Sequence, residues 1–175
     1  MAVVRKARRA GSGDLLDAAL VDRVRAILAL GGVPHADLQD GVQQVRLKLL
    51  EARAEGREAL RSPAAWCAVV ASNIAMDWHR ERRRRERLDE RLTALRPWDT
   101  TQPGGEEARV LSLSVAEGLD ELPLPQRQVL VLRFYADLPV ADIAEALGIP
   151  GGTVKSRLHA AVRALRARLH TDEVV

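Results

Sequence analysis

Residues 138–169 constrain the fold most, because a short apolar helix, a tight turn and a second helix follow one another there. The first helix is predicted over residues 140–147. It stops at Gly148, which suits the left-handed residue that ends a helix, and Pro150 prevents its continuation. The second helix is predicted to open at Thr153, a residue type that caps helix N-termini. This order is typical of a helix-turn-helix, whose second helix enters the major groove of DNA.

The second helix of this motif combines an apolar stripe with a basic surface. The stripe has helical spacing and consists of Val154, Leu158, Val162, Leu165 and Leu169. Ile143 and Leu147 of the preceding helix are expected to pack against it. Between Thr153 and His170 there are five basic residues and no acid. Helix N-termini also attract anions, so the pattern favours phosphate binding over a merely solvated basic face.

Length and composition limit the remaining possibilities. The chain has 175 residues, 47% hydrophobic and 29% charged, which is typical of one or two small soluble domains. Its single cysteine, Cys67, excludes an intrachain disulfide and favours the reducing cytoplasm. No apolar run approaches the roughly 18 residues of a membrane span, so no membrane insertion is expected. Residues 1–13 are basic without a signal peptide's apolar stretch, and we expect a disordered tail.

Motifs of catalysis and of metal or cofactor binding are missing from the sequence. Cys67 has no CxxC partner, and there is neither a GxxxxGK phosphate loop nor a GxSxG elbow. The histidines lie far apart and show no ligand spacing: His35, His79, His159 and His170. We therefore expect no enzymatic activity, no catalytic residue, no metal site and no cofactor.

Helical periodicity recurs along the chain without strand alternation, so we expect an all-α fold. Besides the helix-turn-helix, helices are predicted from Asp14 to about Leu30, about Ala36 to Ala54, Ser62-Pro63 to about Leu92, about Val110 to Leu119, and Pro125 to Tyr135. Residues 96–109 contain two prolines and two glycines, which is typical of a flexible linker. The prediction is two small helical domains, residues 14–95 and 110–175, with the helix-turn-helix in the second.

A run of arginines lies near the end of the first predicted domain. Residues 80–91 read RERRRRERLDER, and a basic patch of this kind attracts nucleic acid. Alternating Arg and Glu is equally typical of a solvated helix, so the run alone leaves both interpretations open. On the same predicted helix, Trp66, Asn73 and Asp77 share one face. The Asn73 amide can pair with a base edge, or it can be a buried group bonded to backbone.

The chain resembles bacterial sigma factors of the extracytoplasmic-function class. The resemblance covers nearly the whole chain after the tail and is strongest over residues 121–169, where GTVKSRLH at 152–159 is close to the family pattern. It implies a factor that binds core RNA polymerase, directs promoter-specific initiation and assists strand opening. The second domain would read the upstream (minus-thirty-five) element. Its candidate contacts are Thr153, Lys155, Ser156, Arg157, His159 and Arg163.

The first domain follows the family pattern more loosely. Residues 62–85 resemble the segment for the downstream (minus-ten) element, with candidates Trp66, Asn73, Asp77, Arg80, Arg83 and Arg84. Residues 37–52 resemble the helix that binds the clamp of the largest polymerase subunit, with candidates Asp37, Asp40, Gln43 and Gln44. The chain departs from the family there at Gln44, Arg46, Leu50 and Gly41, and a mid-helix Gly costs about 1 kcal/mol against Ala. An anti-sigma factor, common in the family, is a further possible partner besides polymerase and promoter DNA.

Aromatic residues are scarce, at 3% of the chain. Trp66, Trp78 and His79 are the only conventional candidates near the basic run for stacking on unpaired bases. Because stacking stabilises a captured base by about 1–3 kcal/mol, we expect this chain to hold few bases and to choose promoters stringently.

Two other functions stay open. A stand-alone regulator would use the same helix-turn-helix, with residues 14–95 for dimerisation or effector binding, and would bind a palindrome as a dimer. An interaction protein would sequester polymerase or an anti-sigma factor without initiating transcription. A sigma factor should bind promoters poorly alone and gain specificity with core polymerase, whereas a dimeric regulator binds DNA by itself.

Overall fold

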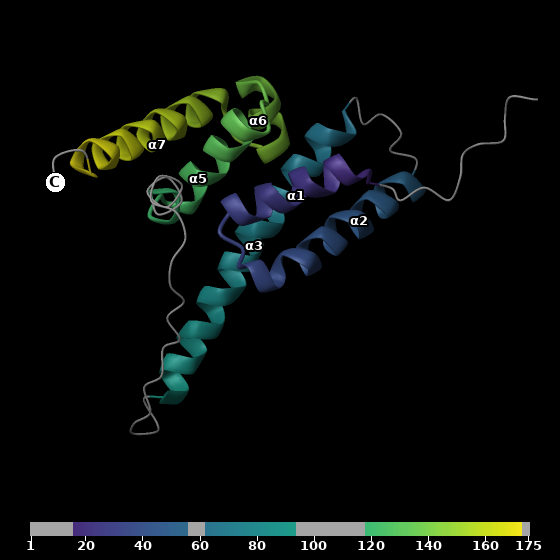
Figure 1. Ribbon diagram of the computed structural model, residues 1–175, viewed down its shortest axis with the longest axis horizontal. Helices are drawn as coiled ribbons and strands as arrows, with labels where there is room; N and C mark the ends of the chain where they lie inside the picture. The colour runs from purple at the N-terminus through teal and green to yellow at the C-terminus, as the bar shows by residue number, and fades with distance from the viewer. Residues whose placement is uncertain (1–15, 56–61, 94–117, 173–175) are drawn as a thin grey trace, which may run out of the picture.

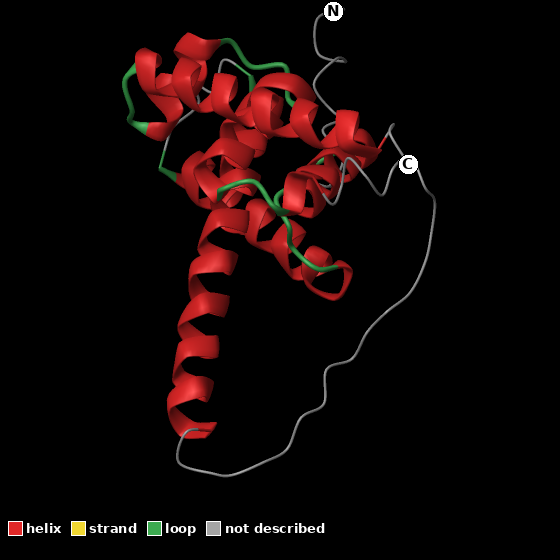
Figure 2. Ribbon diagram, turned by 90° about the vertical axis from the view of Figure 1, so that its left-hand side faces the viewer, coloured by secondary structure: helices red, strands yellow, loops and turns green. Residues whose placement is uncertain are grey.

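The computed structural model describes residues 16–55, 62–93 and 118–172, and these residues form helices without any strand. The N-terminal helices are α1 (Ala18–Leu30), α2 (Leu38–Ala54) and α3 (Pro63–Thr93), with a short 3-10 turn, η1 (His35–Asp37), before α2 (Figure 1). The C-terminal helices are α5 (Leu124–Leu130), η2 (Val131–Tyr135), α6 (Val140–Leu147) and α7 (Gly151–Asp172). The predicted all-α fold is confirmed (Figure 2).

Side-chain caps set the starts of two N-terminal helices. The Asp17 carboxylate accepts a hydrogen bond from the Leu20 N–H at 2.8 Å, so α1 begins at Ala18 and not at Asp14 as predicted. The start of α3 is where the sequence places it, because the Ser62 hydroxyl accepts from the Ala65 N–H at 3.2 Å.

The helix-turn-helix is present with one correction. The first helix, α6, has the predicted bounds, and Gly148 ends it in the left-handed conformation with φ of 62°. The second helix, α7, begins at Gly151 and not at Thr153. The Pro150 carbonyl accepts from the N–H groups of Thr153 at 2.9 Å and Val154 at 3.2 Å. Thr153 therefore lies within the first turn, and its prediction as the helix cap was wrong.

The helix predicted over residues 125–135 is divided into α5 and the π-helical turn η2. The wider turn ends at Ala136, and the following residue, Asp137, has a positive φ of 53°. The Ala136 carbonyl at this break accepts a hydrogen bond from the Arg23 guanidinium of α1 at 2.7 Å. The end of η2 is thus fixed by a residue more than a hundred positions earlier.

One hydrophobic core joins the N-terminal and C-terminal helices. Its buried members from the N-terminal helices include Val24, Leu28, Val42, Val45 and Ile74, and those from the C-terminal helices include Val129, Leu132, Ile143 and Val154. Helices α5, α6 and η2 pack against α3, and η2 also packs against α1 (Figures 1 and 2). The predicted tail (1–13), linker (96–109) and most of the predicted helix from 110 to 119 lie outside the described residues; residues 118–120 are helical.

Gly41 of α2 packs against the Leu28 side chain of α1. A Cβ atom on Gly41 would lie 2.7 Å from Cδ1 of Leu28, so no larger residue fits without movement of that side chain. Gly41 is buried, whereas Gln43 and Gln44 are exposed on the outer side of α2. The difference from the family pattern at Gly41 therefore affects the packing of α1 against α2. It does not change the exposed outer face of α2.

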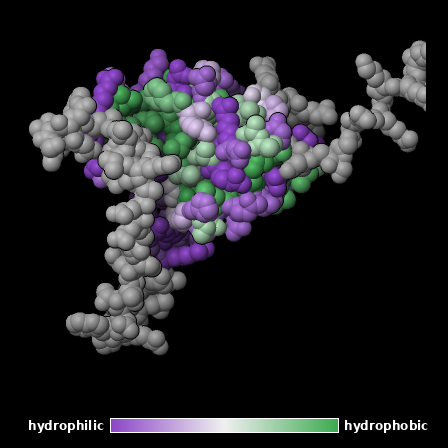
Figure 3. Space-filling view, in the orientation of Figure 1, coloured by the Kyte–Doolittle hydropathy of each residue, from purple (hydrophilic) through white to green (hydrophobic). Residues whose placement is uncertain are grey.

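The C-terminal half of α3 projects beyond the other helices in both views (Figures 1 and 2). Every side chain from Glu81 to Arg87 is exposed along this projection. The face drawn in Figure 3 mixes hydrophilic and hydrophobic residues, with a hydrophobic area over the C-terminal helices at the upper left. Among the described helices, none has the length and apolar content needed to cross a membrane.

Candidate nucleic-acid interface

Helix α7 separates a core-facing side from a basic, solvent-facing side. Val154 and Ala161 are fully buried, at 0% exposure, against the core. Lys155, Ser156, His159 and Arg163 are exposed, while Thr153 and Arg157 are half-buried at the edge of the same surface. The Ser156 hydroxyl donates to the Thr153 carbonyl at 3.0 Å. The structure therefore places all six residues expected at the upstream element on one helix, with Lys155 and Arg163 exposed to solvent and Arg157 half-buried.

The residues expected at the downstream element follow α3 from the core to its projecting end. Trp66 is half-buried and packs against the core, while Asn73, Asp77 and Arg80 are exposed. Asp77 and Arg80 form an ion pair of 3.0 Å whose side chains are 71% and 72% exposed. Such exposed pairs stabilise a protein little, so Arg80 can exchange its partner for a phosphate at small cost.

The arginine run on α3 is partly paired and partly open. Arg82 pairs with Glu86 at 2.7 Å, and Arg85 pairs with Glu81 at 3.3 Å, both one helical turn apart. Arg83 and Arg84 are exposed and form no ion pair within the described part of the chain. The arginine run thus has features of both interpretations. Arg82 and Arg85 belong to a solvated, ion-paired helix surface, whereas Arg83 and Arg84, unpaired within the described residues, are cations of the kind that attracts nucleic acid.

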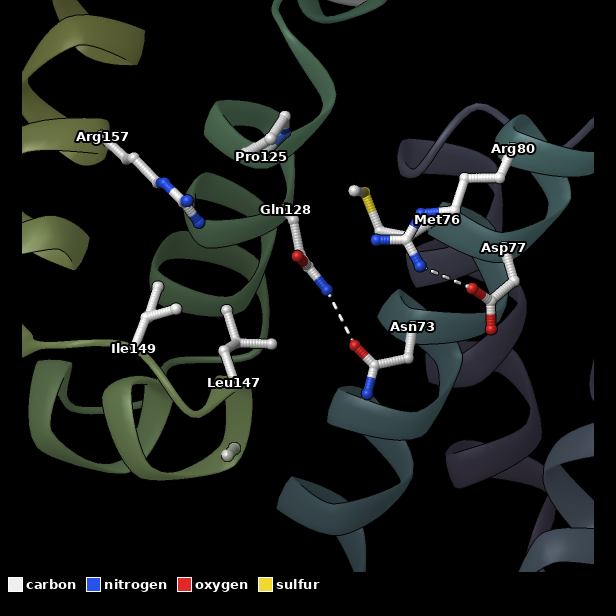
Figure 4. Close-up of a pocket in the computed structure, with 10 residues that line it drawn as sticks. Asn73, Met76, Asp77, Arg80, Pro125, Gln128, Leu147, Ile149 and Arg157 are labelled. Carbon is white, nitrogen blue, oxygen red and sulfur yellow. Dashed lines mark hydrogen bonds and ion pairs between the residues drawn. The ribbon is translucent and has the colours of Figure 1, made fainter. Parts of the chain in front are cut away.

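Asn73 contacts the C-terminal helices. The Gln128 side chain of α5 donates a hydrogen bond from Nε2 to Oδ1 of Asn73 at 2.9 Å and to the Ser72 hydroxyl at 3.3 Å (Figure 4). Asn73 is therefore not the buried, backbone-bonded amide that was the alternative. No local sequence pattern points to Gln128, because its partner Asn73 lies 55 positions away.

The two groups of candidate DNA contacts face a common cavity. Its volume is about 420 Å³, and it is lined by Asn73, Asp77 and Arg80 of α3, Gln128 of α5 and Arg157 of α7. Figure 4 shows Arg157 and Gln128 on one side and Asn73 with Arg80 on the other. Residues expected at the upstream and downstream elements thus lie across one small space from each other.

Arg127 is a buried charge that was not among the candidates predicted from the sequence. Its side chain is 5% exposed and forms an ion pair of 2.7 Å with Asp120. Its Nε–H donates to the Leu30 carbonyl at the end of α1. A buried guanidinium is tolerated only when it is paired and hydrogen-bonded, so Arg127 ties α5 to α1. The one available signal was a charged residue within the mostly apolar sequence of residues 122–132.

The outer face of α2 holds the residues expected at the polymerase. Asp40, Gln43 and Gln44 are exposed, and Asp37 is half-buried. Beside them two leucines are unusually exposed, Leu47 at 56% and Leu50 at 48%. Apolar side chains among polar ones on one helix face are typical of a protein-binding surface. Leu47 was not among the candidates predicted from the sequence, although it follows Gln43 by one helical turn.

Trp78 and His79, both candidates for base stacking, make contacts within the protein. Their rings pack edge to face with centroids 5.1 Å apart, and the Arg82 guanidinium lies 5.5 Å from the Trp78 ring centre. Nε2 of His79 is hydrogen-bonded to the Gly31 carbonyl at 2.8 Å. Burial, opposed by this bond, lowers the pKa of His79 below its ordinary value, and nearby guanidinium groups, Arg127 first, lower it further.

Cys67 is a buried core residue without signs of reactivity. Burial raises the pKa of its thiol to about 11, although the charge of Arg53 acts in the opposite direction. Within the described ranges, no group of His, Cys, Asp and Glu side chains could hold a metal ion.

Comparison with known proteins points to one family. Residues 118–167 match the family model described as Sigma-70, region 4. The chain is 35% identical over 134 residues to the ECF RNA polymerase sigma factor SigL of Mycobacterium tuberculosis. The aligned region covers 77% of this chain and 75% of that protein. It is 32% identical to the RNA polymerase sigma-E factor of Streptomyces antibioticus, over 93% of this chain and 89% of that protein.

A solved structure shares the fold. It is the sigma factor RpoE of Bartonella quintana, crystallised with the anti-sigma factor NepR. The TM-score is 0.66 at 20% sequence identity, and the match covers 88% of this chain and 94% of that one.

Proposed function

The chain belongs to the extracytoplasmic-function sigma factors of RNA polymerase and directs transcription initiation, and we propose that its helices divide promoter recognition among three surfaces. The observation that carries this proposal is the arrangement of α7, with its apolar side in the core and its basic side in solvent. In the proposal, residues 14–95 and 110–175 act as two domains connected by residues 96–109. Such a connection raises the effective concentration of each domain at its own element.

The upstream element is bound by the first turns of α7. Lys155, Arg157 and Arg163 contact phosphates or base edges, and Thr153, Ser156 and His159 add hydrogen bonds. Phosphate contacts fix the position of the helix, while base contacts and DNA shape select the sequence. The exposure of these side chains and the absence of acids from residues 153–170 support this assignment.

The downstream element is bound by α3, which also assists strand opening. The amide of Asn73 reads the edge of an unpaired base, with Trp66 and Asp77 beside it, and Arg80, Arg83 and Arg84 bind phosphates of the adjoining strand. The exposure of Arg83 and Arg84 on the projecting half of α3 supports the phosphate contacts.

Core polymerase is bound by the outer face of α2, in the clamp region of the largest subunit. The polar candidates are Asp37, Asp40, Gln43 and Gln44. Leu47 and Leu50 supply the apolar area that these polar residues lack, and both lie on the exposed side of the helix. Because protein interfaces combine an apolar centre with a polar rim, the two leucines strengthen the assignment.

Further features of the proposal concern location and regulation. The chain acts in the cytoplasm, where polymerase and DNA are, and it catalyses no reaction itself. An anti-sigma factor is a further partner: the Bartonella quintana RpoE was crystallised with one, NepR, and shares this fold.

The dependence of DNA binding on polymerase tests the proposal. The chain is mixed with fragmented genomic DNA, with and without bacterial core polymerase, and the retained fragments are sequenced. Selective retention of a few fragments only with core polymerase is the expected result. Selective retention by the chain alone, together with a dimer in analytical ultracentrifugation, would establish the stand-alone regulator instead.

The Leu47→Glu variant is the matched control. Leu47 is exposed, so this variant should fold normally yet lose polymerase-dependent retention. If the parent chain binds core polymerase but no new transcripts form in its presence, the chain is an interaction protein that sequesters polymerase.

A further inference from the structure

We propose that the cavity lined by α3, α5 and α7 binds an adenine nucleoside monophosphate, with its phosphate on Arg157 and its base on the amides of Asn73 and Gln128. The binding itself does not depend on the proposed function. Its consequence, a competition between the nucleotide and promoter DNA for Arg157 and Asn73, rests on that function.

The cavity has the size and the position of a small-ligand site. Its volume of about 420 Å³ lies within the roughly 300–1,000 Å³ of sites for drug-sized molecules, which often lie between helices. Asn73 and Arg80 on its α3 side are exposed, so a ligand can enter from solvent. A nucleoside monophosphate fits a space of this size, whereas duplex DNA is much too large to enter.

Arg157 provides a guanidinium without a partner. The side chain is half-buried, and within the described ranges it forms no ion pair and no side-chain hydrogen bond. Figure 4 shows it extending from α7 toward Gln128. A guanidinium binds phosphate through two parallel hydrogen bonds, and such bonds strengthen when the group is partly removed from water. Arg157 is therefore the phosphate-binding residue of the proposed site.

Arg80 and Asp77 set the charge of the α3 side of the cavity. They form the exposed ion pair of 3.0 Å, and both line the space. Together with Arg157, the lining residues carry two guanidinium groups and one carboxylate, which leaves one net positive charge. A phosphate monoester carries about −1.5 to −2 charges at pH 7, so this cavity attracts it more strongly than a neutral ligand.

The two amides in the cavity leave one acceptor and one donor unused. Nε2 of Gln128 donates to Oδ1 of Asn73 at 2.9 Å and to the Ser72 hydroxyl at 3.3 Å. Oε1 of Gln128 and Nδ2 of Asn73 have no partner among the described residues. Adenine offers the matching edge, because its N6 amino group donates and its N7 accepts, whereas guanine presents two acceptors on the same edge. The amides should therefore prefer adenine to guanine.

Apolar side chains provide surface for the faces of a base. They are Met76 of α3, Pro125 in the first turn of α5, and Leu147 and Ile149 on either side of the α6 end (Figure 4). Burial of a planar base against them removes apolar surface from water, which stabilises the complex. Inorganic phosphate would leave this surface unused, so it should bind more weakly than a whole nucleotide.

Calorimetric titration of the full chain with AMP, GMP, adenosine and inorganic phosphate tests the inference. AMP should bind saturably to one site per chain. The other three probes should each bind at least about tenfold more weakly, because each lacks one of the expected contacts. Absence of saturable AMP binding would overturn the inference. Equal binding of GMP would overturn the adenine assignment, and equal binding of inorganic phosphate would reduce the cavity to a general anion site.

Two variants change the affinity in opposite directions. Arg157→Ala should weaken AMP binding at least about tenfold and leave the weaker binding of adenosine unchanged. Asp77→Asn should tighten AMP binding, because it removes a negative charge from the cavity, and a gain in affinity cannot result from unfolding. Arg166→Ala is the matched control, since Arg166 is an exposed arginine of the same helix that does not line the cavity. Unchanged AMP affinity in folded Arg157→Ala and in Asp77→Asn would place the ligand elsewhere and overturn the inference.

The outcomes separate this inference from the proposed function. AMP added before the DNA should lower the retention of genomic fragments with core polymerase, because both ligands use Arg157 and Asn73. AMP binding without lowered retention would support the site and overturn the competition. Normal retention without any AMP binding would overturn the inference and leave the proposed function intact.

Discussion

The indole N–H of Trp78 donates a hydrogen bond to the carboxylate of Asp37 at 3.2 Å. Sequence patterns assigned these two residues to different ligands, Trp78 to unpaired bases and Asp37 to polymerase. In the structure they are partners, and their bond joins α3 to the start of α2. The bond adds a polar contact to the apolar packing between α3, the proposed downstream-element helix, and α2, the proposed polymerase-binding helix.

Replacing Trp78 with Phe should destabilise the chain by about 1 kcal/mol, because the ring packing is kept while the bond to Asp37 is lost. Asp37→Ala should have a similar effect, and the double variant should be little worse than either single one. A double-mutant cycle of urea unfolding measures this coupling. Asp40→Ala, at an exposed carboxylate of the same helix, is the control. Additive effects of the Trp78 and Asp37 changes would show that the bond contributes nothing.

Replacing Arg157 with Ala should lower promoter-dependent initiation by at least about tenfold, since one lost base or phosphate contact is worth about 1–3 kcal/mol. Arg157 is a half-buried residue of α7 that lines the cavity and is not among the proposed polymerase contacts on α2, so binding to core polymerase should persist. Transcription and polymerase affinity are measured on the same preparation. Equal loss of both would contradict the division of labour between α7 and α2.

Replacing Asn73 with Ala should impair open-complex formation more than closed-complex binding, because its amide is expected to meet an unpaired base. Permanganate footprinting reports the melted thymines, and gel shift at low temperature reports the closed complex. Gln128→Ala is a matched control, since it also breaks the bond to Asn73 but leaves the Asn73 amide in place. Unchanged permanganate reactivity in Asn73→Ala would refute the role.

Replacing Leu47 and Leu50 with Glu should weaken binding to core polymerase by at least about tenfold without unfolding the chain, because both side chains are exposed. Fluorescence titration with labelled protein measures the affinity, and thermal unfolding checks the fold. Ala19→Glu adds a charge at an exposed position of α1 and should bind normally. Normal binding by the leucine variants would move the polymerase contact away from this face.

His79 should make the stability of the chain depend on pH. Its pKa is lowered in the folded state, so the unfolded chain binds the proton more readily. Stability from this group is therefore present above the ordinary pKa of 6.5 and declines as the pH falls below it. Urea unfolding between about pH 7.5 and about pH 5.5 should show a larger loss for the parent than for His79→Gln. Parallel curves would mean that the folded chain does not resist protonation of His79.

Local chemistry allowed much of the fold to be predicted. Gly148 ends α6 and Ser62 caps α3, because each of these residues acts on atoms within a few positions of itself. The cap at Thr153 was predicted wrongly, since Pro150 uses a backbone carbonyl and needs no side-chain signature. The buried and exposed sides of α7 could also be predicted from the sequence, because the apolar stripe marks the buried side and the remaining side chains point away from it.

The contacts between the N-terminal and C-terminal helices could not be predicted in the same way. Gln128 meets Asn73 across 55 positions, and Arg127 meets Leu30 across 97. Neither pair has a spacing that periodicity can detect. The role of Gly41 was equally hidden, because the reason for a glycine there is the Leu28 side chain of another helix. Long-range packing thus decided which of the candidate residues are accessible.

Run-off transcription on fragmented genomic DNA with bacterial core polymerase, with and without this chain, tests the central claim most directly. Start sites are mapped in both reactions. New discrete starts that share two spaced upstream motifs are the predicted result. An absence of new starts, from a folded chain that binds DNA but does not co-elute with core polymerase, would contradict the account.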